Sequence, residues 1–391
     1  MMRNIGNKRS IIIFFMIMFC MAVIENIKGV IVPQVKDYYQ VTSVDISYML
    51  TWSSLAYILF TFYTGNIANR IGQKTTEFLS VSFIVLACIT MVLAPNFIVF
   101  ILGMIFLNAG LALNGVIINS VVPVLAVGAQ SVIVNTLHFM YGFGASAGQT
   151  VTSIFLGRGQ QFQSVYLFLG IVFMLLMVLS LRIHYPETPI RENQELNHLP
   201  NKYRDYRFYL MTLAMGLYIF AEIGLGNWLV DYFYSTQGMT EDQAGTYIAL
   251  FFLFLAIGRL LGGFIIDRIG KFKSIIAGAL IGAALIILGL CLKGQAYYLI
   301  SLAGLFYSIV FPTAVLLISR LFKHDIAFIT GKILTFNSIG SMIYNQLVGY
   351  VIDGLGFEVA IFMMPLAAIL SAGIFYILYR QSQLDRTEEI Q

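Results

Sequence analysis

The chain reads Gly65-Asn66-Ile67-Ala68-Asn69-Arg70-Ile71-Gly72-Gln73-Lys74 where a long apolar run ends in a short basic turn. The same pattern returns as Gly263-Phe264-Ile265-Ile266-Asp267-Arg268-Ile269-Gly270-Lys271. From position 65 to position 263 the offset is 198, about half of the 391 residues. A period this long excludes a solenoid, whose repeats span roughly 20–50 residues. The two copies therefore indicate a protein built from two similar halves, as transporters with internal repeats are.

The composition is typical of a membrane protein. Hydrophobic residues make up 59% of the chain and charged residues 11%, and the mean hydropathy is +0.84. A soluble domain carries about 25% charged residues. The chain divides into about twelve apolar runs of roughly 20 residues, the length of helix that crosses a bilayer. We therefore predict an all-α polytopic membrane protein made of two pseudo-symmetric bundles with about six helices each.

Composition and motifs also exclude several classes of function. The net charge of +4 comes from basic residues at the ends of the predicted spans, so it does not indicate nucleic acid. The cysteines Cys20, Cys88 and Cys291 lie in apolar runs without paired spacing, so we expect neither disulfides nor a metal site. No Gly-x-x-x-x-Gly-Lys-(Ser/Thr) loop occurs, so ATP is not the expected energy source. We expect no enzyme activity and no cofactor.

The predicted spans follow one another with short turns. In the first half they cover about 10–33 (ending at Pro33), 45–68, 75–94, 97–127, 131–156 and 163–181. In the second half they cover about 207–236, 242–266, 274–293, 296–321, 327–352 and 358–380. Residues 182–206 combine prolines with mixed charges, which cannot lie in lipid. The predicted organisation is an N-terminal bundle (1–181), a cytoplasmic linker (182–206) and a C-terminal bundle (207–391).

The lysines and arginines predict the orientation in the membrane. With the N-terminus inside, eighteen of them fall on the cytoplasmic side and three outside, at Lys36, Arg158 and Lys293. Both termini and both basic turns are therefore expected on the cytoplasmic side of the cell membrane. The first apolar run contains Glu25 and is too long for a signal-peptide core, so we interpret it as the first span rather than a cleaved leader.

Two six-span halves, this topology and a charged central loop resemble the major facilitator superfamily. The repeated turn is similar to that superfamily's motif Gly-x-x-x-Asp-Arg-x-Gly-Arg-(Arg/Lys). The matching residues are Gly65, Asn69, Arg70, Gly72, Gly263, Asp267, Arg268 and Gly270. The resemblance implies that the motif's Asp and Arg latch the cytoplasmic side of the outward-open state. Asn69 replaces the aspartate of the motif, so the strength of the latch is in doubt in the first half.

Shorter motifs resemble the fucose/glucose–cation symporter branch. They are Asn108-Ala109-Gly110-Leu111 with Asn119, Asn135 with Phe143-Gly144-Ala145, Phe220-Ala221-Glu222 with Trp228, Ile257-Gly258-Arg259, and Phe311-Pro312-Thr313. In the fucose permease, spans 1 and 4 carry a proton-linked Asp and Glu. Gly29 and Gly115 stand at those positions here, so proton coupling by those carboxylates does not carry over.

Ionisable groups inside a membrane are costly and are functional candidates by default. The candidates are Glu25 and Lys28 in span 1, His138 in span 5, Glu222 in span 7 and Arg259 in span 8. From 25 to 222 the offset is 197, close to that of the motif, so the two glutamates are expected to be symmetry mates near the translocation path.

These charges leave alternatives open. Glu25 and Lys28, three residues apart on one helix face, form either a fixed ion pair or a switch that a proton or substrate opens. An unpaired Lys28 would attract an anionic substrate. Buried Arg259 needs a partner; Glu222 is the expected one, and backbone carbonyls are the alternative. His138 is either a packing group or a titrating one.

Two glycines and several amide and aromatic side chains complete the candidate site. Gly224 and Gly226 predict either an unwound span 7 or close helix packing. The remaining candidates are Asn119, Asn135, Asn337, Asn345, Trp52 and Trp228. Such residues supply the amide hydrogen bonds and flat stacking that sugar sites use. The chain has 32 Phe and 22 Tyr, however, so aromatic rings occur on many faces.

The sequence predicts a monomeric secondary active transporter in the lipid bilayer that moves a small polar solute, such as a sugar, together with H⁺ or Na⁺. Glu25 and Glu222 are the coupling candidates. Two alternatives stay open. One is a proton-coupled exporter of drugs or metabolites, since two acids in an aromatic cavity suit a cation. The other is a membrane sensor or receptor, which would bind without flux.

Overall fold

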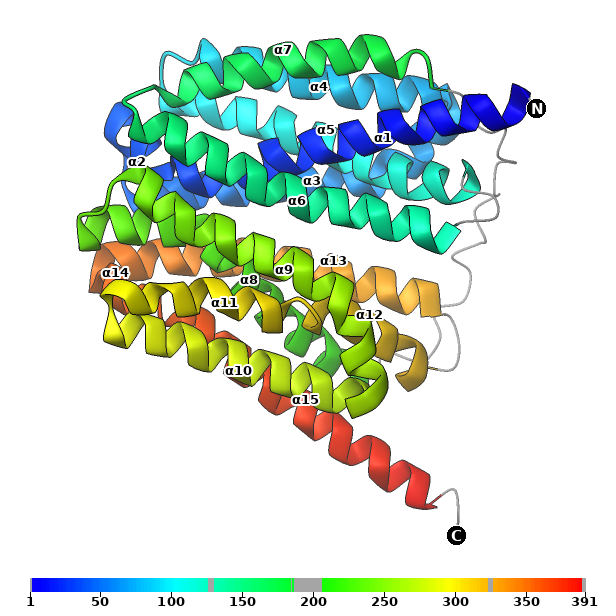
Figure 1. The fold of residues 1–391 in the computed structure, drawn as a ribbon, viewed down its shortest axis with the longest axis vertical. Coiled ribbons are helices and arrows are strands. Elements are labelled where there is room, and N and C mark those ends of the chain that lie inside the picture. The colour runs from blue at the N-terminus through cyan, green and yellow to red at the C-terminus, as the bar shows by residue number, and fades with distance from the viewer. Residues whose placement is uncertain (1, 126–129, 184, 186–205, 323–325, 389–391) are drawn as a thin grey trace. The chain divides into compact units, whose positions relative to one another are not determined.

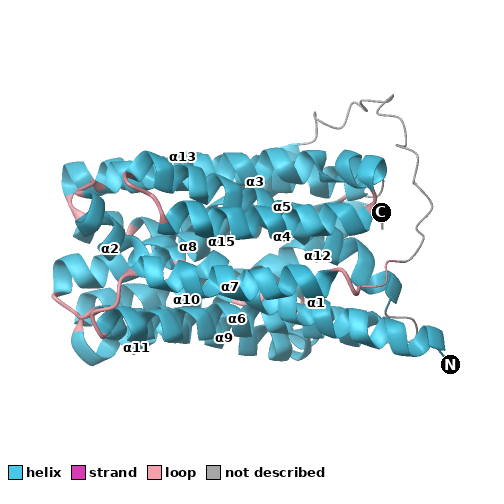
Figure 2. Ribbon diagram, turned by 90° about the horizontal axis from the view of Figure 1, so that it is seen from above, coloured by secondary structure: helices cyan, strands magenta, loops and turns pink. Residues whose placement is uncertain are grey.

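The computed structural model describes residues 2–125, 130–183, 185, 206–322 and 326–388. Over these residues the elements are all helices, as Figure 2 shows, so the predicted all-α fold is confirmed. The chain separates into two compact units. The N unit comprises Met1–Glu192 with Met239–Gly245, and the C unit comprises Asn193–Gly238 with Thr246–Gln391.

The N unit holds the helices drawn in blue to green in Figure 1. They are α1 (Met2–Asn26), α2 (Lys28–Tyr39), α3 (Ser43–Ile71), α4 (Gln73–Val92), α5 (Phe97–Leu125), α6 (Gln130–Gly157) and α7 (Phe162–Ser180). Helix α5 packs against α3 and α4, α7 packs against α4, and α1 packs against α6. Helix α3 begins where Thr42 and Asp45 form a capping box, which satisfies two amide groups that the helix start leaves unpaired.

The C unit contains the remaining helices, except that α9 belongs to the N unit up to Gly245. They are α8 (Tyr206–Gln237), α9 (Glu241–Ile269), α10 (Lys271–Leu292), the 3₁₀ turn η2 (Gly294–Tyr297), α11 (Tyr298–Tyr307), α12 (Val310–Leu321), α13 (Ile326–Leu355), α14 (Phe357–Ala360) and α15 (Met363–Glu388). Helix α8 packs against α13 and α15, and α10 packs against α11 and α15. Small residues bring α9 close to α11, because a Cβ on Gly304 would meet the Phe251 carbonyl oxygen.

Nine helical stretches in the described residues are long and apolar enough to cross a membrane. Helices α3, α6 and α13 have 29, 28 and 30 residues, and they are not among the nine. They correspond to the predicted spans at about 45–68, 131–156 and 327–352. These three helices are therefore long enough to cross a bilayer.

The first predicted span is wrong in its end point. The sequence predicts an end at Pro33, but α2 continues through Pro33 to Tyr39, and the interruption lies at Ile27. Proline removes one backbone donor and crowds the carbonyl four residues earlier, which here belongs to Gly29. The interruption at Ile27 lies two residues before Gly29, so the backbone there can move away from the proline ring. Helix α2 therefore accommodates Pro33.

Two other spans are informative about helix continuity. The span predicted at about 296–321 corresponds to the candidate span Gly294–Ile318, but its helix is interrupted between α11 and α12, next to Pro312, whose ring nitrogen has no hydrogen to donate. Of the two alternatives for span 7, unwinding is wrong, because α8 runs unbroken past Gly224 and Gly226. A Cβ at these two glycines would approach Met364 at 3.1 Å and Phe252 at 3.2 Å. Close packing is therefore the correct interpretation of both.

The two copies of the basic turn have nearly the same backbone conformation. Gly72, between α3 and α4, has φ 84° and ψ 154°, and Gly270, between α9 and α10, has φ 90° and ψ 148°. Each glycine carbonyl accepts a side-chain hydrogen bond four residues on, from Thr76 at 2.8 Å and from Ser274 at 2.9 Å. This backbone region is open to glycine and strained for other residues.

Replacing either turn glycine with alanine should lower the free energy of unfolding by about 1–3 kcal/mol, because a Cβ strains this conformation. Denaturation in mixed micelles measures the change for Gly72→Ala and Gly270→Ala. Gly373 is the matched control, since it lies inside α15 with nothing within 4 Å of an added Cβ. Gly373→Ala should stabilise the protein slightly. Equal effects at all three positions would contradict the argument.

Candidate functional site

The interruption between α1 and α2 creates a polar cluster in the N unit. Asn26 ends α1, and its backbone carbonyl accepts a hydrogen bond from Gln149 Nε2 of α6 at 3.2 Å. Its side-chain Nδ2 donates to the Ala22 carbonyl at 2.9 Å. Carbonyls at a helix end lack helical donors, so the Gln149 side chain supplies the donor that the interrupted helix has lost.

Glu25 lies beside this interruption and has a tyrosine partner. Tyr141 of α6 donates its hydroxyl proton to Glu25 Oε2 at 2.8 Å. The same hydroxyl accepts from Asn26 Nδ2 at 3.3 Å. The Tyr141 hydroxyl therefore donates one hydrogen bond and accepts another, and it links Glu25 to Asn26.

Lys28 is the first residue of α2, directly after the interruption at Ile27. Within the residues that the structure describes, Lys28 makes no salt-bridge contact or hydrogen bond, but Glu25 acts on it electrostatically. The two side chains therefore lie close together without direct contact. The choice between a fixed ion pair and a switch stays a prediction.

The C unit contains a second polar cluster, near the middle of α8. Arg259 Nη2 of α9 lies 3.5 Å from Glu222 Oε1, so the ion pair predicted from the sequence is present. Tyr218 Oη lies 2.6 Å from Glu222 Oε2 and 2.5 Å from the Tyr307 carbonyl oxygen. The side chains of Arg259 and Glu222 keep 29% and 14% exposure, so a solute or water can reach them.

The amide and aromatic candidates of the C unit lie in its interior. Asn337 is 3% exposed, and neither polar atom of its amide has a partner among the described residues. It lines a groove between α8 and α13 together with Gly216 and Tyr344. Asn345 Oδ1 accepts from Asn227 Nδ2 at 3.4 Å. Trp228 is 0% exposed.

The remaining candidates of the N unit do not join the cluster around Glu25. Trp52 on α3 is 50% exposed. Asn119 is exposed and donates to the Gly115 carbonyl of its own helix at 2.7 Å. His138 is exposed on α6 and has an interaction partner. The side chain of Asn135 lies outside the described residues.

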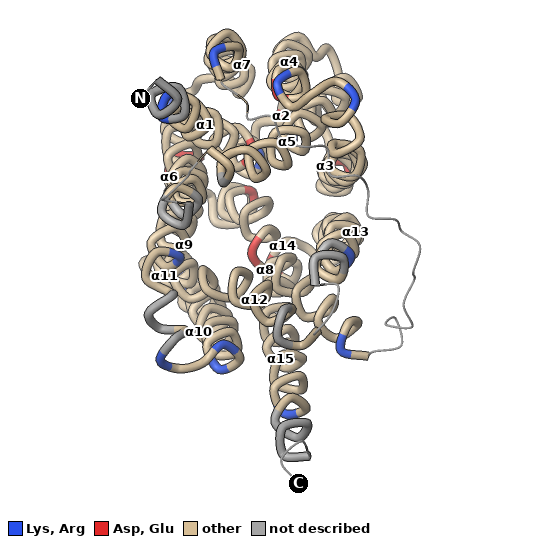
Figure 3. The backbone as a smooth tube through the Cα atoms, turned by 90° about the vertical axis from the view of Figure 1, so that its right-hand side faces the viewer, with Lys and Arg blue, Asp and Glu red and all other residues tan. Residues whose placement is uncertain are grey.

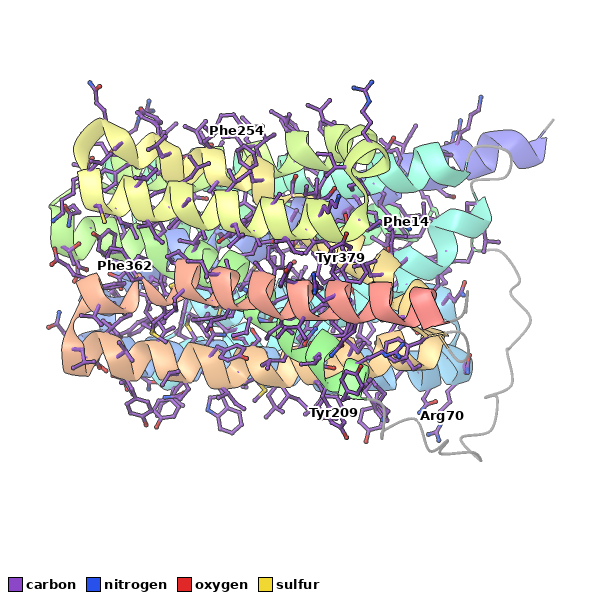
Figure 4. All side chains as sticks on the ribbon, turned by 90° about the horizontal axis from the view of Figure 1, so that it is seen from below. Phe14, Arg70, Tyr209, Phe254, Phe362 and Tyr379 are labelled. Carbon is purple, nitrogen blue, oxygen red and sulfur yellow. The ribbon has the colours of Figure 1, made fainter. Side chains whose placement is uncertain are left out.

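The basic turns lie at helix ends. Figure 3 shows Lys and Arg in blue where α3 meets α4 and where α9 meets α10, and Figure 4 shows Arg70 at the end of its helix. Gly65, Asn69, Arg70 and Arg268 are exposed. Gly263 and Asp267 lie within α9, and the side chain of Asp267 lies outside the described residues. The latch role of the motif therefore stays a prediction.

Sequence reasoning missed a buried carboxyl group in the N unit. Glu77 of α4 and Asn114 of α5 are both 0% exposed, and Asn114 Nδ2 donates to Glu77 Oε1 at 2.5 Å. Burial and the nearby Glu77 raise the pKa of Tyr185, in the segment after α7. The ring of Tyr185 packs edge-on against Phe14 of α1 at 6.0 Å between centroids. Glu77 lies near the start of the span predicted at about 75–94, so its place in the sequence does not mark it as a buried group.

The tyrosine partners of the two glutamates were also missed. Tyr218 precedes Glu222 by one helical turn, so the i, i+4 spacing could have identified it. Tyr141 comes from another helix, and no local spacing points to it. No group of three His, Cys, Asp or Glu side chains comes together in the part of the chain that the structure describes.

Comparisons with known proteins agree on one family. A model of the Major Facilitator Superfamily matches residues 13–292 and 211–390. A TsgA homolog of Buchnera aphidicola subsp. Schizaphis graminum is 22% identical over 354 residues, covering 88% of each chain. A glucose/galactose transporter of Brucella abortus biovar 1 is 23% identical over 376 residues, covering 90% of this chain and 89% of that protein.

A solved structure shows the same fold. A variant of the E. coli fucose:proton symporter FucP superposes with a TM-score of 0.65 at 20% identity, covering 95% of this chain and 97% of that chain. At this level of identity the likeness concerns the fold.

Replacing Asn114 with leucine should lower the free energy of unfolding by about 1–3 kcal/mol, because the buried Glu77 carboxyl loses its donor. Denaturation in mixed micelles measures the loss. The double variant Glu77→Leu/Asn114→Leu should recover most of it, since two apolar side chains need no partners. Asn108→Leu is the control: it is buried on the same helix and donates only to the Met104 carbonyl. An equal loss in that control would refute the pairing.

Proposed function

Because the chain belongs to the Major Facilitator Superfamily, we propose that it is a secondary active transporter for a small polar solute, such as a sugar. Transport proceeds by alternating access and is driven by a gradient of H⁺ or Na⁺.

The Glu222–Arg259 cluster is the observation that carries the coupling proposal. An ionisable pair inside membrane helices is costly and is retained where it serves transport. Glu222 lies near the middle of α8, which has 32 residues, and it keeps partial exposure. A cation or proton that binds the Glu222 carboxyl would change the net charge of the Glu222–Arg259 pair.

Three observations support a sugar as the solute. One relative is named a glucose/galactose transporter, and one structural neighbour is a fucose:proton symporter. The groove between α8 and α13 also contains an amide, that of Asn337, with no partner in the described residues. A free buried amide is able to donate to and accept from hydroxyl groups.

The charge distribution supports a proposed orientation. Cytoplasmic loops carry an excess of Lys and Arg, and the basic turns after α3 and α9 fit that rule. We place both termini and the linker 182–206, which joins the bundles 1–181 and 207–391, in the cytoplasm. The protein would act as a monomer in the cell membrane.

Glu222→Gln should abolish gradient-driven accumulation but spare counterflow, because the amide keeps the shape of the side chain and cannot titrate. Proteoliposomes with an imposed pH or Na⁺ gradient, and labelled glucose, galactose and fucose as probes, measure both activities. Normal accumulation by this variant would remove Glu222 from the coupling mechanism.

Glu358→Gln is the matched control. Glu358 pairs with Lys293 at 3.4 Å, and its side chain is 67% exposed, so its loss should leave accumulation unchanged. If the unmodified protein accumulates none of the three sugars, the sugar proposal is wrong and another class of polar solute has to be screened.

A further inference from the structure

Asn337 of α13 has a buried amide that the rest of the C unit leaves unsatisfied. The residue is 3% exposed, and neither Oδ1 nor Nδ2 has a hydrogen-bond partner among the described residues. Burying an amide without hydrogen bonds is unfavourable, and most buried polar side chains in proteins are paired. An exception inside a membrane-spanning bundle therefore indicates a group whose partner is a ligand.

The Asn337 amide lies at the wall of a groove that has room for a ligand. The groove runs between α8 and α13 and encloses about 190 Å³, whereas one water molecule takes up roughly 30 Å³. Gly216 of α8 lies opposite the amide, because a Cβ at this glycine would be 3.1 Å from Asn337 Oδ1 and 3.9 Å from Tyr344 Oη. Two polar groups of α13 therefore meet the groove where α8 has no side chain, and the space exceeds that of a single bridging water.

Aromatic rings line the same groove and are held in place by the protein. Phe208 and Phe336 pack edge to face with their centroids 6.1 Å apart. Tyr344, two helical turns beyond Asn337, packs against Phe220 at 4.9 Å. Phe208, Phe336 and Tyr344 all line the groove. Flat apolar walls with a few well-placed polar groups are typical of small-molecule sites.

The lining of the groove is uncharged. None of its lining residues, in the described part of the chain, is an Asp, Glu, Lys, Arg or His. A charged solute would lose its hydration in the groove without gaining an opposite charge, which is costly. The lining therefore favours a neutral solute.

The amide group matches a pair of neighbouring hydroxyl groups. It donates through Nδ2 and accepts through Oδ1, and each hydroxyl is able to accept or donate. We propose that the groove between α8 and α13 binds a neutral sugar ring and that the Asn337 amide bonds to two adjacent hydroxyl groups of that ring. This inference rests on the transport function proposed above and narrows its solute to neutral sugars, so that sugar acids, amino sugars and sugar phosphates are rejected.

Asn337→Leu tests the role of the amide in binding. Leucine is similar in size and needs no hydrogen-bond partner, so the solute-free variant should be at least as stable as the unmodified protein. Its affinity for neutral sugars should fall at least about tenfold. Thermal unfolding in mixed micelles measures the first effect. Titration calorimetry of the full chain with glucose, galactose, fucose and xylose measures the second.

Asn114→Leu is the matched control, because Asn114 is an equally buried amide that has a partner, Glu77. This variant should lose stability and keep the sugar affinity of the unmodified protein. Unchanged sugar binding in Asn337→Leu, or a loss of stability as large as that of Asn114→Leu, would overturn the proposal. So would an unmodified protein that binds none of the four neutral sugars.

Monodeoxy sugars test the contact with two hydroxyl groups. For the neutral sugar that binds, removal of either of the two adjacent hydroxyls should weaken binding to the unmodified protein about tenfold, because one amide atom loses its partner. In Asn337→Leu, titrated at higher sugar concentration, the same removals should have no effect. Equal losses in both proteins, or no loss with any monodeoxy form, would refute the contact with the amide.

Charged analogues test the neutrality of the site. At neutral pH, glucuronate and glucosamine should bind the unmodified protein at least about tenfold more weakly than glucose, because the groove offers neither of them an opposite charge. Tighter binding of either analogue would show that the solute is charged and would overturn this part of the proposal.

A transport measurement in proteoliposomes separates this inference from the proposed function. If neutral sugars bind through Asn337 but none is accumulated, the proposed function is wrong and the binding site stands. If Asn337→Leu accumulates neutral sugars as the unmodified protein does, the binding site is wrong and the proposed function stands.

Discussion

A backbone carbonyl released inside a membrane has to find a donor within the protein, because lipid offers none. This constraint determines which residues surround the two helix interruptions. At the first, Gln149 donates to the carbonyl of Asn26. At the second, Tyr218 lies in hydrogen-bond contact with the carbonyl of Tyr307. At each interruption, a side chain from another helix therefore contacts the released carbonyl. The first interruption lies beside Glu25, and the second is contacted by Tyr218, which is a partner of Glu222.

The two halves share a backbone plan and differ in their chemistry. Gly72 and Gly270 have nearly the same φ and ψ, as expected of a repeated turn. The interruptions do not correspond, because one falls in the first span of its half and the other in the fourth. The buried Glu77 also has no counterpart, since Ile275 stands at that place in the second half. The repeat therefore explains the backbone that the two halves share, and the polar sites form where the two halves differ.

Much of the fold was predictable because apolar length and basic turns are local properties of the chain. The repeat offset predicts that Glu25 and Glu222 are symmetry mates. The need of a buried arginine for a partner correctly predicted the pair that Arg259 forms with Glu222. The interruptions at Ile27 and after Tyr307 were not predictable, since Pro33 marked the wrong place. Tyr141 and Asn114 are partners contributed by neighbouring helices, and no spacing along one helix reveals such contacts.

The placement of the tryptophans has a practical consequence. The protein has two of them: Trp228 is fully enclosed in the C unit, whereas Trp52 in the N unit is 50% exposed. Indole emission depends on the polarity around the ring, so each half contains its own natural fluorophore in a distinct environment. A quencher dissolved in the surrounding medium would reach the first half and spare the second, which allows the two halves to be observed separately without any label.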